Sequence, residues 1–99
     1  MIILTLNLHT YQEPKQDEKF DEIVRAIDFY NPDFICFQEC AQHKDSEFIQ
    51  NSQIIRVDNM AHIICAKLQL KKKKYHYFWE WVHYGFDKWE EGLAILSKY

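Results

Sequence analysis

Pro32-Asp33-Phe34-Ile35-Cys36-Phe37-Gln38-Glu39 holds a short apolar run, bounded by a proline before it and by two polar residues after it. A short, bounded apolar run is typical of a buried β-strand. We therefore predict a strand over residues 33–39. This strand decides the fold because it follows a segment with the apolar spacing of a helix.

A second apolar run, Ile2 to Leu6, stops at Asn7 and predicts a strand over residues 2–7 that is covered on both faces. Between the two strands, over residues 17–30, apolar side chains recur at spacings of three and four, which is typical of an amphipathic helix. Asn31-Pro32 ends that helix. A strand, a helix and a strand in this order predict a βαβ unit with parallel strands and a right-handed crossover.

The later part of the chain predicts a second helix and two more strands. Asp58 is the expected N-cap of the helix, after an irregular loop over residues 41–57. The aromatic-rich run over residues 75–82 and the apolar run within residues 92–97 predict strands, and residues 83–92 link them. The helices carry their apolar stripes on one side, so we expect both on one face of a four-stranded sheet.

Lys71 to Lys74 fall at the expected C-terminal turn of the second helix. Four adjacent lysines can form a phosphate-binding or membrane-surface patch. They are also favourable at the negative end of a helix dipole, where they need no ligand. We favour this second interpretation.

The composition sets limits on fold and function. With 47% hydrophobic and 27% charged residues, the chain predicts one globular domain over residues 1–99, and two glycines with two prolines argue against an all-β sandwich of short hairpins. A net charge of −3 disfavours tight nucleic-acid binding. No apolar run approaches the length of a membrane-spanning helix and no signal peptide is visible, so we expect a cytoplasmic protein with no membrane partner.

Three cysteines are an odd number for a disulfide framework, and we expect them to be reduced. Together with a histidine they could be imagined as a zinc site. The spacing of Cys36 and Cys40 matches no usual zinc pair, so we favour buried, inert thiols.

Polar residues follow both strands of the βαβ unit. Asn7 ends the first strand and Gln38-Glu39 ends the second, so both reach the edge of the sheet where α/β proteins bind ligands. A carboxylate held there suits a hard cation such as Mg²⁺, and a nearby amide can orient a second ligand. On the residues alone this pairing is only suggestive, because strands often end in Glu.

Three segments in order, LTLNLHTY (4–11), PDFICFQE (32–39) and DKWEEGLAILSKY (87–99), resemble the endonuclease/exonuclease/phosphatase superfamily of DNase I-like, metal-dependent phosphoesterases, nearest its bacterial sphingomyelinase-like branch. The resemblance implies an α/β fold that is half of a DNase I-like four-layer sandwich. This half is one four-stranded mixed sheet with two helices on one face. In the family a second such sheet packs on the other face.

The resemblance also implies a site. Asn7 and Glu39 match catalytic positions, and Glu39 matches the ligand of Mg²⁺ or Mn²⁺, with weak metal binding expected in this chain alone. His83, Tyr84 and Glu91 would lie at the mouth of the site. The other histidines receive no catalytic role: His9, His43, His62 and His76.

Family members are more than twice as long, and their later half supplies a phosphate-contacting His, an Asp-x-Asn motif and an Asp-His pair that this sequence lacks. We therefore interpret the chain as the N-terminal part of a metal-dependent phosphodiesterase or phosphoesterase, inactive by itself. The alternative is a non-enzymatic, self-associating module. In either case we expect a homodimer through the open sheet face, because helices cover only the other face.

Overall fold

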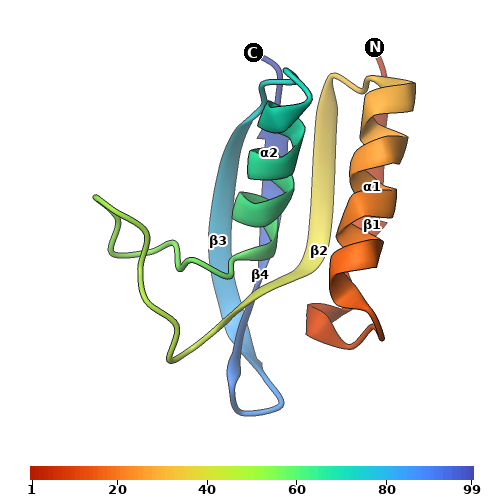
Figure 1. The fold of residues 1–99 in the computed structure, drawn as a ribbon. Coiled ribbons are helices and arrows are strands. Elements are labelled where there is room, and N and C mark those ends of the chain that lie inside the picture. Colours follow the sequence, from red (N-terminus) through yellow and green to blue (C-terminus); the bar gives the residue numbers. More distant parts are fainter.

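The computed structural model describes residues 1–99 and consists of one four-stranded sheet with two helices on one face (Figure 1). This arrangement confirms the predicted α/β class. The elements in chain order are β1 (Ile3–Asn7), the 3₁₀ turn η1 (His9–Tyr11), α1 (Gln16–Tyr30), β2 (Phe34–His43), α2 (Met60–Leu70), β3 (His76–Gly85) and β4 (Trp89–Ser97).

The sheet has the strand order β1-β2-β4-β3. β1 and β2 are parallel, as predicted for the βαβ unit, whereas β4 is antiparallel to both β2 and β3. β1 is therefore an edge strand, and the side chain of Ile3 is 62% exposed. The expectation that this strand is covered on both faces is wrong for the chain as it stands, since no element lies over its second face.

Helix boundaries follow local capping chemistry. α1 ends where Asn31 takes a left-handed conformation and returns its N–H to the carbonyl of Ile27. α2 is capped by Asn59, not by Asp58 as predicted, because Asn59 Oδ1 accepts the N–H groups of Ala61 and His62. α2 ends at Leu70, so Lys71 is its C-cap and the next three lysines lie beyond the last turn.

The core lies between the sheet and the helices. Alternate residues of β2 and β4 point toward the helices, and Ile35, Phe37 and Leu96 are at most 1% exposed there. They pack with Ile64 and with Ile27 in one hydrophobic cluster. Burial of these apolar side chains explains why both helices lie on the same face.

β2 and the β3–β4 pair are longer than predicted. β2 continues past Glu39 to His43, after a bulge that shifts its register with β4 between Phe37 and Cys40. Residues 83–92 are not a linker: β3 and β4 extend into a hairpin closed at Phe86 and Asp87, both at positive φ. Three residues, 86–88, lie between the paired Gly85 and Trp89, and two adjacent positive-φ residues suit the twist of the flanking strands, here without glycine at either position.

The face of the sheet away from the helices is open and apolar. Across it, Cys36 of β2 is paired with Ile95 of β4, and Ile95 is paired with Phe78 of β3. Phe78, Leu93 and Ile95 are 68%, 52% and 51% exposed. We call this surface, formed with Ile3 and Cys36, the open face.

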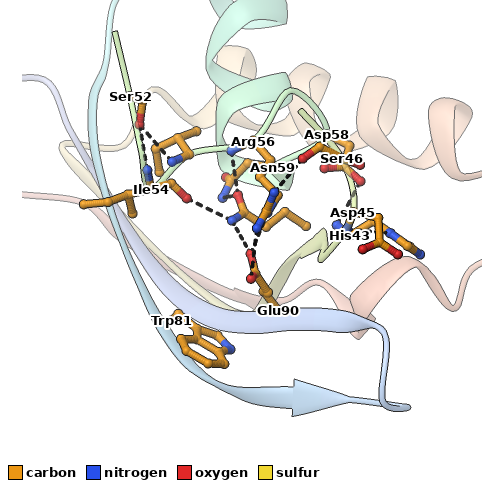
Figure 2. Close-up of polar contacts among 12 residues, drawn as sticks. His43, Asp45, Ser46, Ser52, Ile54, Arg56, Asp58, Asn59, Trp81 and Glu90 are labelled. Atoms are coloured by element: carbon orange, nitrogen blue, oxygen red, sulfur yellow. Dashed lines mark hydrogen bonds and ion pairs between the residues drawn. The ribbon is translucent and has the colours of Figure 1, made fainter. Parts of the chain in front are cut away.

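The loop over residues 44–59 is held to the sheet by a polar network (Figure 2). The guanidinium of Arg56 donates to the carboxylate of Glu90 on β4 at 2.9 Å, and Gln42 Nε2 donates to the same carboxylate at 2.7 Å. Gln42 Oε1 in turn accepts from Asn59 Nδ2 at 2.9 Å. The sequence predicted an irregular loop here without these anchors.

The network also sets the ionisation of Glu90. Burial raises the pKa of this carboxyl, but the hydrogen bonds from Arg56 and Gln42 outweigh burial, so the pKa of Glu90 lies below its ordinary value. Arg56 further lies over the ring of Phe48, 4.1 Å from its centroid. The Arg56–Glu90 ion pair therefore joins the loop to β4, and Gln42 connects β2 to the same carboxylate.

Candidate functional site

Asn7, the last residue of β1, and Glu39, within β2, lie together where the pairing of these two strands ends. The two strands are parallel and in register from Ile3 with Phe34 to Asn7 with Gln38, so Glu39 directly follows the last residue of β2 that pairs with β1. Asn7 Nδ2 donates to Glu39 Oε2 at 2.7 Å. The structure thus brings together the two residues that the sequence singled out.

Both ends of the Asn7 amide are fixed. Its Oδ1 accepts the backbone N–H of His9 at 2.9 Å, while its Nδ2 is held by Glu39. The backbone N–H of Leu8 adds a bond to the carbonyl of Gln38 at 2.8 Å. The amide can therefore present only its N–H group to the carboxylate.

Glu39 is positioned by the bulge in β2. It has φ 46°, within the segment where the register of β2 with β4 shifts. A bulge adds a residue to one strand and redirects the side chain, and such bulges recur next to active sites. Here the redirection brings the Glu39 carboxylate to Asn7 on the neighbouring strand.

Thr10 links this pair to β4, and the sequence did not single it out. η1 has positive φ at each residue, and this places the buried Thr10 hydroxyl between two glutamates. The hydroxyl donates to Glu91 Oε2 at 2.5 Å and lies 3.4 Å from the carbonyl oxygen of Glu39. The only sequence signal was its place three residues after Asn7, in the segment that leaves β1.

The residues expected at the mouth of the site separate into two groups. His83 Nε2 lies 2.9 Å from Glu91 Oε1, so His83 and Glu91 join Thr10 in one polar chain. Tyr84 is 51% exposed and packs edge-on against Trp81 instead. The polar chain runs from Glu39 through Thr10 and Glu91 to His83.

The donor set fits a hard cation only in part. Glu39 Oε1 accepts no hydrogen bond from the protein, whereas the Asn7 oxygen is already used by His9. No group of three or more His, Cys, Asp or Glu side chains is close enough to hold a metal ion. One carboxylate oxygen would leave most of a shell of about six ligands to water, so the residues present fit weak binding.

The cysteines, His9 and His62 do not belong to this polar chain. Burial raises the pKa of the Cys40 and Cys65 thiols to about 12, and all three cysteines are free. His9 pairs with Glu13 at 2.8 Å, and His62 bonds to the hydroxyl of Tyr77. A thiol with a raised pKa is a poor nucleophile, so Cys40 and Cys65 are structural.

Neither helix has the length and apolar character needed to cross a membrane. No protein-family model matches the sequence, and no curated protein matches it. Among solved structures, an endonuclease/exonuclease/phosphatase family protein from Leptotrichia buccalis C-1013-b superimposes with a TM-score of 0.94 at 34% sequence identity. The match covers 100% of this chain and 37% of that protein, so the chain spans little more than a third of that protein's length.

Proposed function

We propose that this chain, which shares its whole fold with part of an endonuclease/exonuclease/phosphatase family protein, supplies the metal-side portion of a phosphodiesterase or phosphoesterase site. One observation carries the proposal. Asn7 and Glu39, 32 positions apart in the sequence, are joined by a 2.7 Å hydrogen bond at the ligand-binding edge of the sheet.

Each residue has a distinct role in this proposal. Glu39 Oε1 is the free oxygen and would bind Mg²⁺ or Mn²⁺, which when bound supplies charge stabilisation to a phosphoester. Asn7 fixes the rotamer of Glu39 through Oε2, and Thr10 holds the main chain of η1 against β4. The three side chains together keep one carboxylate oxygen aimed outward.

We further propose that these 99 residues alone do not turn over substrate. The family resemblance places a phosphate-contacting His and a water-activating Asp in segments that this sequence does not contain. Loss of a general acid or base costs on the order of 10² to 10⁴ in rate, and here both are missing. A cytoplasmic location, suggested by three free thiols, belongs to the same proposal.

Titration with Mn²⁺, followed by the electron spin resonance of the free ion, tests the metal role. We expect weak binding to the wild type that Glu39→Gln abolishes and Asn7→Ala weakens. Glu47→Gln, which removes an exposed carboxylate from the loop, is the matched control and should leave binding unchanged. Equal binding by the wild type and Glu39→Gln would refute a metal role for Glu39.

Hydrolysis of bis(4-nitrophenyl) phosphate with Mg²⁺ or Mn²⁺ tests the activity separately. We expect no turnover above the buffer rate. Robust turnover by the wild type that Glu39→Ala removes would show that the residues present are sufficient for catalysis.

The open face supports a second candidate, a non-enzymatic self-associating module. A homodimer that stacks two open faces would bury Phe78, Leu93 and Ile95, which are each more than half exposed in one chain. Stable interfaces bury roughly 800 Å² per partner, about the scale of a four-stranded face. Sedimentation equilibrium at micromolar concentration tests this: a dimer that Ile95→Glu dissociates supports it, and a monodisperse wild-type monomer contradicts it.

A further inference from the structure

The outer surface of the two helices carries large apolar side chains in water. Phe29, near the end of α1, is 81% exposed, and Leu70, the last residue of α2, is 86% exposed. Both helices end at the same end of the molecule (Figure 1). Isolated exposed apolar residues are ordinary, but these two lie beside a cluster of cations.

A groove of about 300 Å³ runs between α1 and α2 at this surface. Its lining combines apolar side chains with cationic ones and a single carboxylate: Val24, Leu70, Arg25, Lys67, Lys71 and Asp21. Arg25 and Phe29 are four residues apart on α1, so they share one side of that helix. The groove and the exposed apolar residues therefore form one surface, which we call the helix-end surface.

The acidic residues near this surface pair with lysines of the protein, and Asp17 and Asp21 share one lysine. Lys67 Nζ lies 3.0 Å from Asp21 and 3.2 Å from Asp17, and Lys73 Nζ lies 3.7 Å from Asp28. The remaining cations of the groove, Arg25 and Lys71, form no ion pair, and neither does Lys72, which follows Lys71 after the end of α2. The helix-end surface is thus positive although the chain as a whole has a net charge of −3.

We propose that the helix-end surface docks on an anionic phospholipid membrane. The helix dipole accounts for lysines after α2, but it does not account for Phe29 and Leu70 pointing into water beside them. Basic side chains with exposed aromatic and aliphatic neighbours match a bilayer surface, where the cations meet phosphate groups and the apolar side chains enter the interface. Nucleic acid would use the cations and leave the apolar side chains without a partner.

This inference departs from the expectation of no membrane partner, which rested on the absence of a spanning segment. Surface docking needs no such segment. α1 returns antiparallel to β1, so the helix ends lie at the opposite end of the sheet from Asn7 and Glu39 (Figure 1). Docking would therefore hold the protein at the membrane while the candidate site faces solution. The inference stands independently of the proposed function.

Co-sedimentation of the chain with vesicles tests the proposal. We expect binding to equal parts of phosphatidylglycerol and phosphatidylcholine, little binding to pure phosphatidylcholine, and release as salt is raised. Lys71→Gln with Lys72→Gln should weaken partitioning about fivefold per charge removed. The control pair Lys44→Gln with Lys88→Gln removes the same charge from exposed positions away from the helix ends and should have a smaller effect.

The apolar residues separate a membrane from other polyanions. Phe29→Ser with Leu70→Ser changes exposed side chains only, so circular dichroism should match the wild type while vesicle binding falls. A single-stranded oligonucleotide is the competing probe. The proposal is overturned if anionic vesicles do not bind, or if the oligonucleotide binds as well as vesicles and the serine variant binds both like the wild type.

Discussion

The hydroxyl of Thr10 donates to the carboxylate of Glu91 at 2.5 Å, although 81 positions separate the two residues in the chain. Thr10 belongs to the left-handed turn η1 that follows β1, and Glu91 belongs to β4. β2, with Glu39, lies between these strands in the sheet. A single threonine thus fixes the segment that follows Asn7 against the far side of the candidate site.

Thr10→Val should destabilise the fold more than Thr10→Ser. Valine keeps the shape but removes the donor to Glu91 Oε2, and a hydrogen bond to a charged group contributes about 1.5–3 kcal/mol. Serine keeps the hydroxyl and should lose less than half of that free energy. Urea unfolding followed by tryptophan fluorescence measures both, and equal losses for the two variants would show that only packing matters at this position.

Arg56→Met should lower the free energy of unfolding by about 1–3 kcal/mol, because it leaves the partly buried carboxylate of Glu90 with Gln42 as its only donor. Lys44→Met, in the same loop but exposed, is the control and should change stability little. The urea midpoints of the two variants provide the comparison. If Arg56→Met unfolds at the wild-type midpoint, the ion pair does not hold the loop.

The lowered pKa of Glu90 also predicts that the fold loses stability in acid. Its pKa is lower in the folded than in the unfolded chain, so its contribution is complete above the unfolded pKa of about 4.3 and disappears as pH falls through the lower folded value. Glu90→Gln should therefore be less stable than the wild type near pH 7 and lose less stability on acidification. Urea midpoints at several pH values test this, and parallel pH profiles would contradict it.

Cys36 should be the fast-reacting thiol of the native chain. It lies on the open face, whereas Cys40 and Cys65 have pKa values raised to about 12 by burial. Reaction with Ellman's reagent should show one fast phase that Cys36→Ser removes. If two chains stack their open faces, this phase slows as protein concentration rises; two or more fast thiols in the folded chain would contradict the assignment.

Gly92→Ala should be strongly destabilising, by about 1–3 kcal/mol or more. A Cβ at this position would meet the carbonyl oxygen of Glu80 in the neighbouring strand and lie 2.9 Å from the Trp79 ring. At Gly85 a Cβ would instead meet the carboxylate of Glu91, which can move. Thermal unfolding should therefore show a smaller loss for Gly85→Ala than for Gly92→Ala, and the reverse order would refute the steric argument.

Much of the fold could be predicted because its signals are local. The apolar run from Phe34 to Phe37 and the helical period over residues 17–30 each report on neighbouring residues, and together they imply a parallel pair of strands. That pairing places Asn7 beside Gln38, and the bulge that follows brings Glu39 to Asn7. Most predicted ends lie within one residue of the observed ones, whereas β2, β3 and β4 are each three or four residues longer at one end.

The parts that were missed depend on contacts between distant residues. The bulge at Glu39 and the extension of β2 to His43 are stabilised by β4, which is more than 45 residues later in the chain. The choice of Asn59 over Asp58 as the cap depends on Gln42, which binds the Asn59 amide. The β3–β4 turn uses Phe86 and Asp87 at positive φ, a conformation that aspartate tolerates but that a bulky phenylalanine rarely takes.

The inner position of β4 has a consequence for how the chain folds during synthesis. Of these four strands β4 is the last to leave the ribosome, yet β2 and β3 both pair with it and not with each other. A nascent chain that ends before Trp89 has an unpaired edge on β2 and no partner for β3. The order of translation and the order of strands in space therefore disagree, and the sheet closes only after residues 89–97 have emerged, while β1, α1 and β2 can assemble earlier.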